Sequence, residues 1–272
     1  MAIIRRVQTW QRHVVVTAIS VMLMAPAPVV AADATAREIT ETLARARPGS
    51  VVVLAGQDLS FLDLSGLDFK AARLTAANLY GADLSGANLR HTDLSRALMD
   101  RAIIVGTDFS GANLTRAVMR LPHSSTSPTF NRADAPRFTG ADLSYARLVA
   151  RLDGADFRAA DMTKAKLHPY GDQTQNTAAR RSSLIACDFS GAVLVGADLS
   201  HSLLSFTNFA NADLTGANLR GADLSRTNFS GARLVAADIT DADLDGANLA
   251  GAQGLEQAIG LELARNLDRA IR

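Results

Sequence analysis

The sequence is poor in cysteine and in aromatic residues. Its single cysteine, Cys187, excludes an intramolecular disulfide framework and a zinc site built from several cysteines. Phe, Trp and Tyr make up 5% of the 272 residues, although hydrophobic residues make up 48%. The apolar side chains are therefore mostly small or aliphatic, which favours a narrow, repetitive interior over a thick globular core. A lone cysteine is usually a small buried apolar residue rather than a nucleophile.

Catalytic motifs are also missing. The chain has no HExxH, no GxSxG and no glycine-rich phosphate loop, and its GxG spacings come from a repeat. We therefore expect no enzyme activity and no cofactor. After residue 32 no apolar run is long enough to span a bilayer.

Residues 1–32 have the pattern of a cleavable signal peptide. Arg5, Arg6 and Arg12 precede an apolar run over 14–30, and small residues at 30–32 offer a cleavage site. An uncleaved anchor is the alternative, but Pro26, Pro28 and a run of only about 17 apolar residues argue against a full span. The adjacent arginines leave Sec and twin-arginine export open. We predict a periplasmic or secreted protein.

Charge limits the possible partners. Removing residues 1–32 deletes three arginines and no acid, so the net charge falls from +1 to −2. Such a protein is not a general polyanion binder, and we expect no nucleic-acid partner.

A period of five residues dominates the rest of the chain. In GADLSGANLR, residues 81–90, a leucine returns every fifth residue, which fits neither a helix face nor a strand face. Asp or Asn usually comes just before this apolar centre, and Ala or another small residue comes two before it. The 34 centres run over 59–119, 138–148, 152–167 and 184–249, with a one-residue deletion before Leu152.

This unit resembles the pentapeptide-repeat family, A-[DN]-L-x-x, over about 190 residues. The resemblance implies an all-β fold, a right-handed quadrilateral β-helix with four pentapeptides per coil and with the centre and the small residue pointing inward. Phe189, Phe209 and Phe229 independently recur every 20 residues, which predicts stacked rings. Cys187, two before Phe189, is expected to point inward. The 34 sides predict roughly 8.5 coils and a rod of about 40 Å.

Both ends of the repeat are expected to carry helical caps. Residues 33–57 form the N-terminal cap, with a helix over 36–46 and a short strand over 51–54, before a β-helix over 58–254. In 255–272, Leu255, Ile259, Leu263 and Leu267 lie four apart, which predicts one C-terminal helix. This helix either covers the last coil of a monomer or joins two copies as a homodimer.

Two interruptions of the repeat, 120–137 and 168–183, are rich in loop-forming residues. If neither interruption contains an unrecognised five-residue side of the coil, they leave from adjacent corners. If the first contains such a side, around Phe130 or Ala133, they leave from the same side. Loops on a rigid scaffold commonly carry function. The candidate partner-binding residues in these loops are His123, Arg132, Arg137, His168, Tyr170, Asp172, Arg180 and Arg181.

Charge is also uneven along the chain. Residues 116–181 hold 11 basic and 6 acidic residues, whereas 184–249 hold 3 basic and 8 acidic ones. The simplest explanation of this uneven charge is that outward positions of the repeat tolerate any charge. A metal site at His123, His168 and Asp172 is a further alternative, although two loop histidines are more often solvated.

Two functions fit these features. The first is a noncatalytic exported scaffold that binds a protein of the cell envelope through its faces and two loops. The second, implied by the quinolone-resistance branch of the resembled family, is DNA mimicry toward a type II topoisomerase (gyrase) in the cytoplasm. The signal segment and the basic middle speak against this second function.

Overall fold

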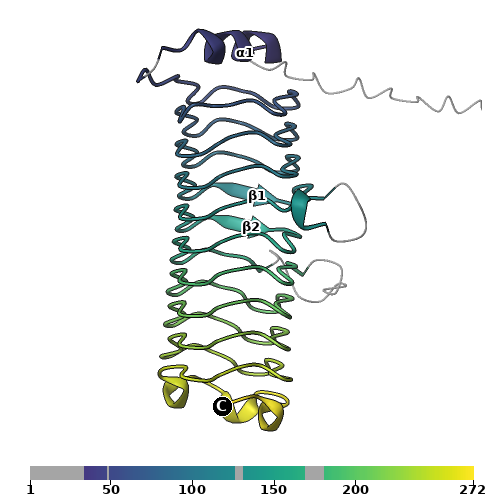
Figure 1. The fold of residues 1–272 in the computed structure, drawn as a ribbon, viewed down its shortest axis with the longest axis vertical. Coiled ribbons are helices and arrows are strands. Elements are labelled where there is room, and N and C mark those ends of the chain that lie inside the picture. The colour runs from purple at the N-terminus through teal and green to yellow at the C-terminus, as the bar shows by residue number, and fades with distance from the viewer. Residues whose placement is uncertain (1–33, 48, 126–130, 169–180) are drawn as a thin grey trace, which may run out of the picture. The chain divides into compact units, whose positions relative to one another are not determined.

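The computed structural model describes residues 34–47, 49–125, 131–168 and 181–272, which belong to one compact unit, Ala32–Arg272. The chain winds into a stack of coils, with α1 (Ala36–Arg45) beside the first coil (Figure 1). In the described ranges no helix is long and apolar enough to cross a membrane. The predicted β-helix is confirmed, whereas the predicted signal peptide lies outside the described residues.

Each coil places residue i beside residue i+20. Parallel bridges join Asp58 to Asn78 and Asn78 to Leu98. The bridges are built from backbone hydrogen bonds: the Leu79 amide donates to the Leu98 carbonyl at 2.7 Å, and the Leu98 amide donates to the Ala77 carbonyl at 3.0 Å. Every five-residue side therefore pairs with the same side of the next coil.

Four bridged ladders run along the rod. We call the sides that begin at Val53, Asp58, Asp63 and Asp68 the first, second, third and fourth side. Over the described residues the first-side ladder passes through ten coils, more than the predicted count of about 8.5, because bridging extends past the first and last counted centres. Its members are Val53, Arg73, Asp93, Asn113, Asp142, Asp161, Val193, Asp213, Arg233 and Gln253.

The predicted one-residue deletion straightens one corner. Arg147 and Arg151, the bridged residues of consecutive sides, lie four apart instead of five. Here β2 (Arg147–Val149) pairs in parallel with β1 (Val118–Arg120), with Met119 opposite Leu148. A shorter side leaves no room for the usual turn, so the chain runs as a strand through the corner.

At each ordinary corner, the residue two positions after the apolar centre adopts the left-handed backbone conformation, with positive φ. Gly221 occupies this position with φ +62°, but so does His201 one coil earlier with φ 56°. The His201 ring lies over Gly221, where an added Cβ would come within 2.6 Å of its Nδ1. At this corner the glycine of the next coil therefore makes room for the ring of His201.

The acidic or amide residue before each centre holds the corner that follows. Asp83 Oδ1 accepts a hydrogen bond from the Ser85 amide at 2.9 Å, and the same bond recurs along the rod. Asparagines at this position also pair between coils, as where Asn228 Nδ2 donates to Asn208 Oδ1 at 3.0 Å. These bonds explain the Asp/Asn preference, since side chains of this length bond a backbone amide two residues on.

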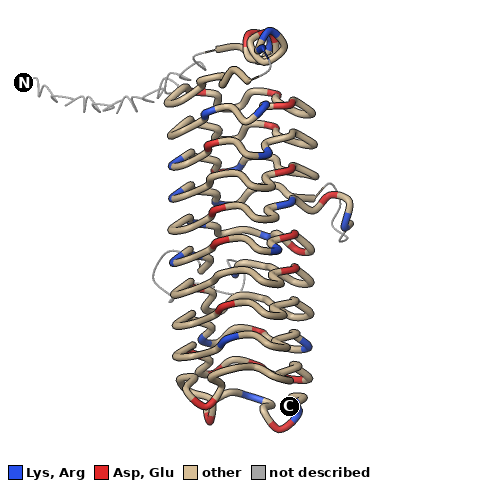
Figure 2. The backbone as a smooth tube through the Cα atoms, turned by 60° about the vertical axis from the view of Figure 1, so that its left-hand side comes forward, with Lys and Arg blue, Asp and Glu red and all other residues tan. Residues whose placement is uncertain are grey.

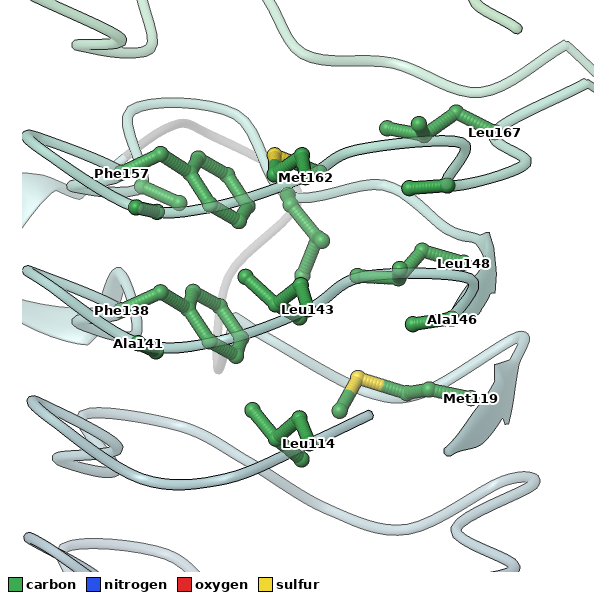
Figure 3. Packing of buried hydrophobic residues seen from close by; sticks show 14 of the residues in the cluster. Leu114, Met119, Phe138, Ala141, Leu143, Ala146, Leu148, Phe157, Met162 and Leu167 are labelled. Atoms are coloured by element: carbon green, nitrogen blue, oxygen red, sulfur yellow. The ribbon is translucent and has the colours of Figure 1, made fainter. Parts of the chain in front are cut away.

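Centres and small residues fill the interior as predicted (Figure 3). Phe189 stacks on Phe209 at a centroid distance of 5.0 Å, and Phe209 on Phe229 at 5.4 Å. The same stack continues through Phe109, Phe138 and Phe157 because the first insertion and the deletion preserve the fourth-side ladder. Cys187 is buried, and its Sγ donates to the Leu152 carbonyl.

The N-terminal helix is confirmed, with a different boundary for the coils. Thr35 and Glu38 form a capping box at the start of α1, and Ile39 and Leu43 are buried with the interior of the coils. The predicted strand at 51–54 is part of the first coil, because Val53 already bridges to Arg73. The β-helix thus begins about five residues before residue 58.

The single C-terminal helix predicted over 255–272 is wrong. The chain instead makes a last coil of six-residue sides with three 3₁₀ turns, η3 (Leu255–Gln257), η4 (Leu261–Leu263) and η5 (Leu267–Arg269). The informative period is six: Leu255, Leu261 and Leu267 pack against the interior. Two residues of the presumed helix face, Ile259 and Leu263, are exposed.

Substituting Gly221 by Ala should destabilise the rod. The left-handed conformation costs a residue with a Cβ about 1–2 kcal/mol, and the His201 ring adds a steric cost. Gly216→Ala is the matched control, since Gly216 has φ +65° with nothing within 4 Å of an added Cβ. Urea unfolding followed by circular dichroism should show the larger loss for Gly221→Ala, and His201→Ala should reduce the difference. Equal losses of stability in Gly221→Ala and Gly216→Ala would contradict the steric effect of the His201 ring.

Candidate functional site

The first insertion begins later than the sequence indicated. His123 bridges to Ile103 on the third side, so the start of the predicted loop is a regular side of the coil. The chain leaves the coil after Ser124 and returns at Asp134, whose carbonyl accepts a hydrogen bond from the Gly106 amide at 2.7 Å. The side hidden in the loop thus lies at His123, not around Phe130 or Ala133.

The returning end of this insertion is anchored on the rod. Asn131 caps the short turn η1 (Arg132–Asp134) by accepting a hydrogen bond from the Ala133 amide at 3.1 Å. Ala135 and Pro136 are buried, and Arg137 resumes the fourth-side ladder beside Asp108. Arg132 and Arg137 are therefore held near the coil.

The second insertion leaves from the neighbouring corner. It lies between Lys166 on the second side and Ser183 on the third side, whereas the first insertion lies between the third and fourth sides. The two insertions therefore leave from adjacent corners although the first predicted loop hides a side, because the chain leaves the coil only after that side. The third side of the intervening coils, which carries His123 and Arg151, lies between the two insertions.

The predicted site residues fall into separate groups. Arg132 and Arg137 line one groove. At the second insertion, His168 Nε2 lies 3.3 Å from Asp198 Oδ2, and Arg181 Nη2 donates to the Gly221 carbonyl at 3.3 Å. The remaining candidates, Tyr170, Asp172 and Arg180, lie outside the described residues.

The groove beside the first insertion is small and polar. It has a volume of about 260 Å³ and joins a shallower hollow of about 490 Å³ through shared walls. Charged side chains of both signs line it, supplied by the fourth side, by the corner after that side and by the end of the first insertion. These residues are Arg90, Asp108, Arg132, Arg137, Asp156, Arg158 and Asp188.

Ion pairs order this groove. Asp108 Oδ2 lies 3.5 Å from both Arg90 Nη1 and Arg137 Nε, and Arg158 Nη2 lies 2.7 Å from Asp156 Oδ2. Burial raises the pKa of Asp108, but the Ser110 hydroxyl and amide and the two guanidinium groups together outweigh it. The pKa of Asp108 therefore lies below its ordinary value.

The groove suits recognition better than catalysis. Arginine presents several donors in a fixed plane and binds carboxylate or phosphate groups in two-pronged fashion. The one thiol is not a nucleophile, because burial strongly raises the pKa of Cys187.

The metal-site alternative gains no support. Within the described ranges, no group of three His, Cys, Asp or Glu side chains lies close enough to hold a metal ion. Of its proposed ligands, His168 pairs with Asp198, and Asp172 lies outside the described residues.

Sequence reasoning missed most of the groove. Asp108, Asp156 and Asp188 lie on the fourth side together with Arg137 and have the sequence of ordinary repeat residues. Arg158 lies at an ordinary corner. Aligning the chain by coil rather than by residue number would have placed Asp108 and Asp156 on either side of Arg137, with Asp188 one coil further on.

Comparison with known proteins identifies the family. The family model "Pentapeptide repeats (8 copies)" matches residues 54–90, 77–116, 137–168, 182–221 and 212–251. These matches cover more than half of the chain, which therefore belongs to the pentapeptide-repeat family. No curated protein matches the sequence.

Several solved structures are similar. HetL of the cyanobacterium Nostoc sp. strain PCC 7120 is 27% identical, with 88% of this chain and 94% of HetL covered and a TM-score of 0.36. A pentapeptide repeat protein of the Arabidopsis thaliana thylakoid lumen is 29% identical, with 43% and 75% covered and a TM-score of 0.33. QnrB1, a plasmid-mediated fluoroquinolone resistance protein, is 19% identical, with 77% and 89% covered and a TM-score of 0.29.

Replacing Asp108 by Asn should weaken the rod modestly. The amide oxygen still accepts from Ser110 but loses the attraction of two solvent-screened arginines, a loss of about 0.2–1 kcal/mol. Because the folded-state pKa of Asp108 is lowered, its contribution is present above the unfolded pKa of about 3.9 and disappears as the pH falls through the folded value.

Thermal unfolding of both proteins at neutral and acidic pH tests this. The stability difference should be present at neutral pH and vanish in acid. Asp63→Asn is the control, because Asp63 bonds Ser65 in the same way but forms no ion pair with the described residues. A difference independent of pH would contradict the assignment.

Proposed function

We propose that this protein is a noncatalytic exported scaffold that binds a protein partner of the cell envelope. In this proposal residues 1–32 direct export and are removed, and the rest forms a right-handed quadrilateral β-helix in the periplasm or outside the cell. Binding occurs through the faces of the rod and the two insertions. No cofactor takes part.

The observation that carries this proposal is the arrangement of the two insertions. They depart from adjacent corners, and the first brings Arg132 and Arg137 into a charged groove with Arg158. A β-helix of repeated small units gives a rigid surface whose neighbours are fixed by the coil, which suits recognition of an extended partner. Family membership supports the fold, and function resides in the sites added to it.

The alternative function is binding of a type II topoisomerase (gyrase) in the cytoplasm. The similarity to QnrB1, a fluoroquinolone resistance protein, motivates it. DNA mimicry requires regular negative charge along a rod. The middle coils instead carry Arg96, Arg116, Lys164 and Lys166 at their surface, which argues against this alternative.

Excising both insertions tests the binding proposal. Residues 125–133 and 169–180 would be replaced by short glycine–serine linkers, which keeps Ser124, Asp134 and the ladder contacts. We expect native-like circular dichroism and cooperative unfolding, because the backbone bonds between coils remain. Envelope proteins that cross-link to the full chain in its native cell and co-purify with it should be lost.

The control is a variant in which the same residues are replaced by scrambled sequences of equal length and composition. It should also lose the partner, because recognition requires the specific side chains. A partner retained by the excised rod would reject the role of the insertions. Loss of the fold on excision would make the insertions structural.

A further inference from the structure

A second charged surface lies away from the groove, at the corner between the first and second sides. Corner residues stack there on four consecutive coils: the Arg96 amide bonds the Thr115 carbonyl, the Arg116 amide the Ser144 carbonyl, and the Tyr145 amide the Thr163 carbonyl. Figure 2 shows basic positions aligned along the left-hand edge of the rod. We call this surface the basic ridge; its residues are Arg96, Arg116, Tyr145, Arg147, Lys164 and Lys166.

Tyr145 organises the ridge. The guanidinium carbon of Arg116, from the preceding coil, lies 5.4 Å from the centre of its ring, and Nζ of Lys164, from the following coil, lies 5.7 Å from it. A cation over an aromatic face is attracted by the ring quadrupole. Tyr145 is 46% exposed, so its ring holds the two cations at the surface.

Four of the five ridge cations have no acidic partner among the described residues. Within the described residues, Arg96, Arg116, Lys164 and Lys166 form no ion pair, unlike Arg90, Arg137 and Arg158 of the groove. Asp198, the bridged neighbour of Lys166 on the second side, pairs with His168, and the acids of the first side are engaged in their own turns. Asp142 Oδ1 accepts from the Ser144 amide and Asp161 Oδ1 from the Thr163 amide, both at 2.9 Å.

Apolar side chains adjoin the cations on the second side. Leu98 and Val118 are bridged neighbours in the two coils that precede Arg147, and Leu98 is 47% exposed. Leu121 is exposed at the next corner. Tyrosine and arginine beside aliphatic residues are typical of the centre of a protein–protein interface.

We propose that the basic ridge binds an acidic, extended segment of a protein partner, with carboxylates at the cations and apolar side chains on Leu98 and Val118. This proposal rests on the proposed binding function and names one surface and its ligand chemistry. Arg96 and Arg116 lie one coil apart, about 4.8 Å, and Arg116 and Lys164 lie two coils apart. Same-side residues of an extended chain recur at about 6.7 Å, and long Arg and Lys side chains bridge this mismatch.

The ridge suits a polypeptide better than a nucleic acid or a membrane. Single-stranded nucleic acids require free aromatic faces on which bases stack. The ring of Tyr145 already contacts Arg116 and Lys164. Leu98 and Val118 lie in line along one ladder, an arrangement that matches the side chains on one face of an extended polypeptide.

The test uses the purified rod and a fluorescein-labelled peptide of alternating Glu and Val. Fluorescence anisotropy should show binding that weakens at least about tenfold in the Arg116→Glu, Lys164→Glu double variant, because two attractive contacts become repulsive. Tyr145→Ala should weaken binding severalfold, whereas Tyr145→Phe, which keeps the ring, should preserve most of it. A peptide of alternating Lys and Val should not bind at the ridge.

Arg226→Glu is the matched control. Arg226 also occupies a left-handed corner, with φ 55°, and its guanidinium carbon lies 5.3 Å from the centre of the Phe206 ring. Unlike the ridge cations, Arg226 lies at the corner after the third side, and this side carries the acids Asp223 and Asp243. Reversing this charge should leave peptide affinity unchanged.

Three results would overturn the proposal. The peptide could bind the double variant as tightly as the natural chain, or Arg226→Glu could weaken it equally. Alternatively, vesicles containing phosphatidylglycerol or a single-stranded oligonucleotide could bind more tightly than the peptide with the same dependence on Arg116 and Lys164. If the peptide binds through the ridge but no envelope partner is captured from cells, the proposed function is rejected and the ridge proposal stands. If a partner is captured and binds the double variant equally well, the ridge proposal is rejected and the proposed function stands.

Discussion

The backbone hydrogen bonds between successive coils determine the rest of the structure. Because they join each residue to the one a full coil later, they decide which side chains become neighbours inside and outside the rod. Phe109 meets Phe138 and Arg116 meets Tyr145 for this reason, although an insertion separates both pairs in the sequence. The interior then demands one large and one small residue per side, and the corners demand a left-handed residue. Surface chemistry is left to the remaining positions.

The same ladders produce two charged surfaces of different character. Acids of the fourth side lie beside arginines of the same side and of the corner after it, so they neutralise one another around Asp108 and Arg158. At the corner that carries Tyr145 the charged residues are all basic, and the tyrosine ring lies between Arg116 and Lys164. The first arrangement orders the return of an insertion, and the second leaves cations available to a partner. The acidic distal coils differ again, since Asp243 and Asp245 pair with Arg265 and Arg269 of the last coil.

The repeat made the fold largely predictable from the sequence, and its limits are equally physical. A centre every fifth residue predicted the coil, the inward position of Cys187 and the Phe stack. The last coil was missed because leucines four apart imitate a helix, whereas the repeated alanines at 252, 258, 264 and 270 carry the true period of six. The groove was missed because Asp156 and Asp188 are ordinary repeat residues until an insertion brings Arg132 beside them. His123 was assigned to a loop since proline at 122 resembles a break, yet it bridges like any other third-side residue.

Export is the condition on which the proposed role depends, because an envelope partner is reachable only outside the cytoplasm. The most direct test is the intact mass of the native protein in separated periplasmic and cytosolic fractions. The account predicts a periplasmic species that begins near Asp33. A full-length cytosolic species that begins at Met1 would contradict it and would favour the topoisomerase alternative.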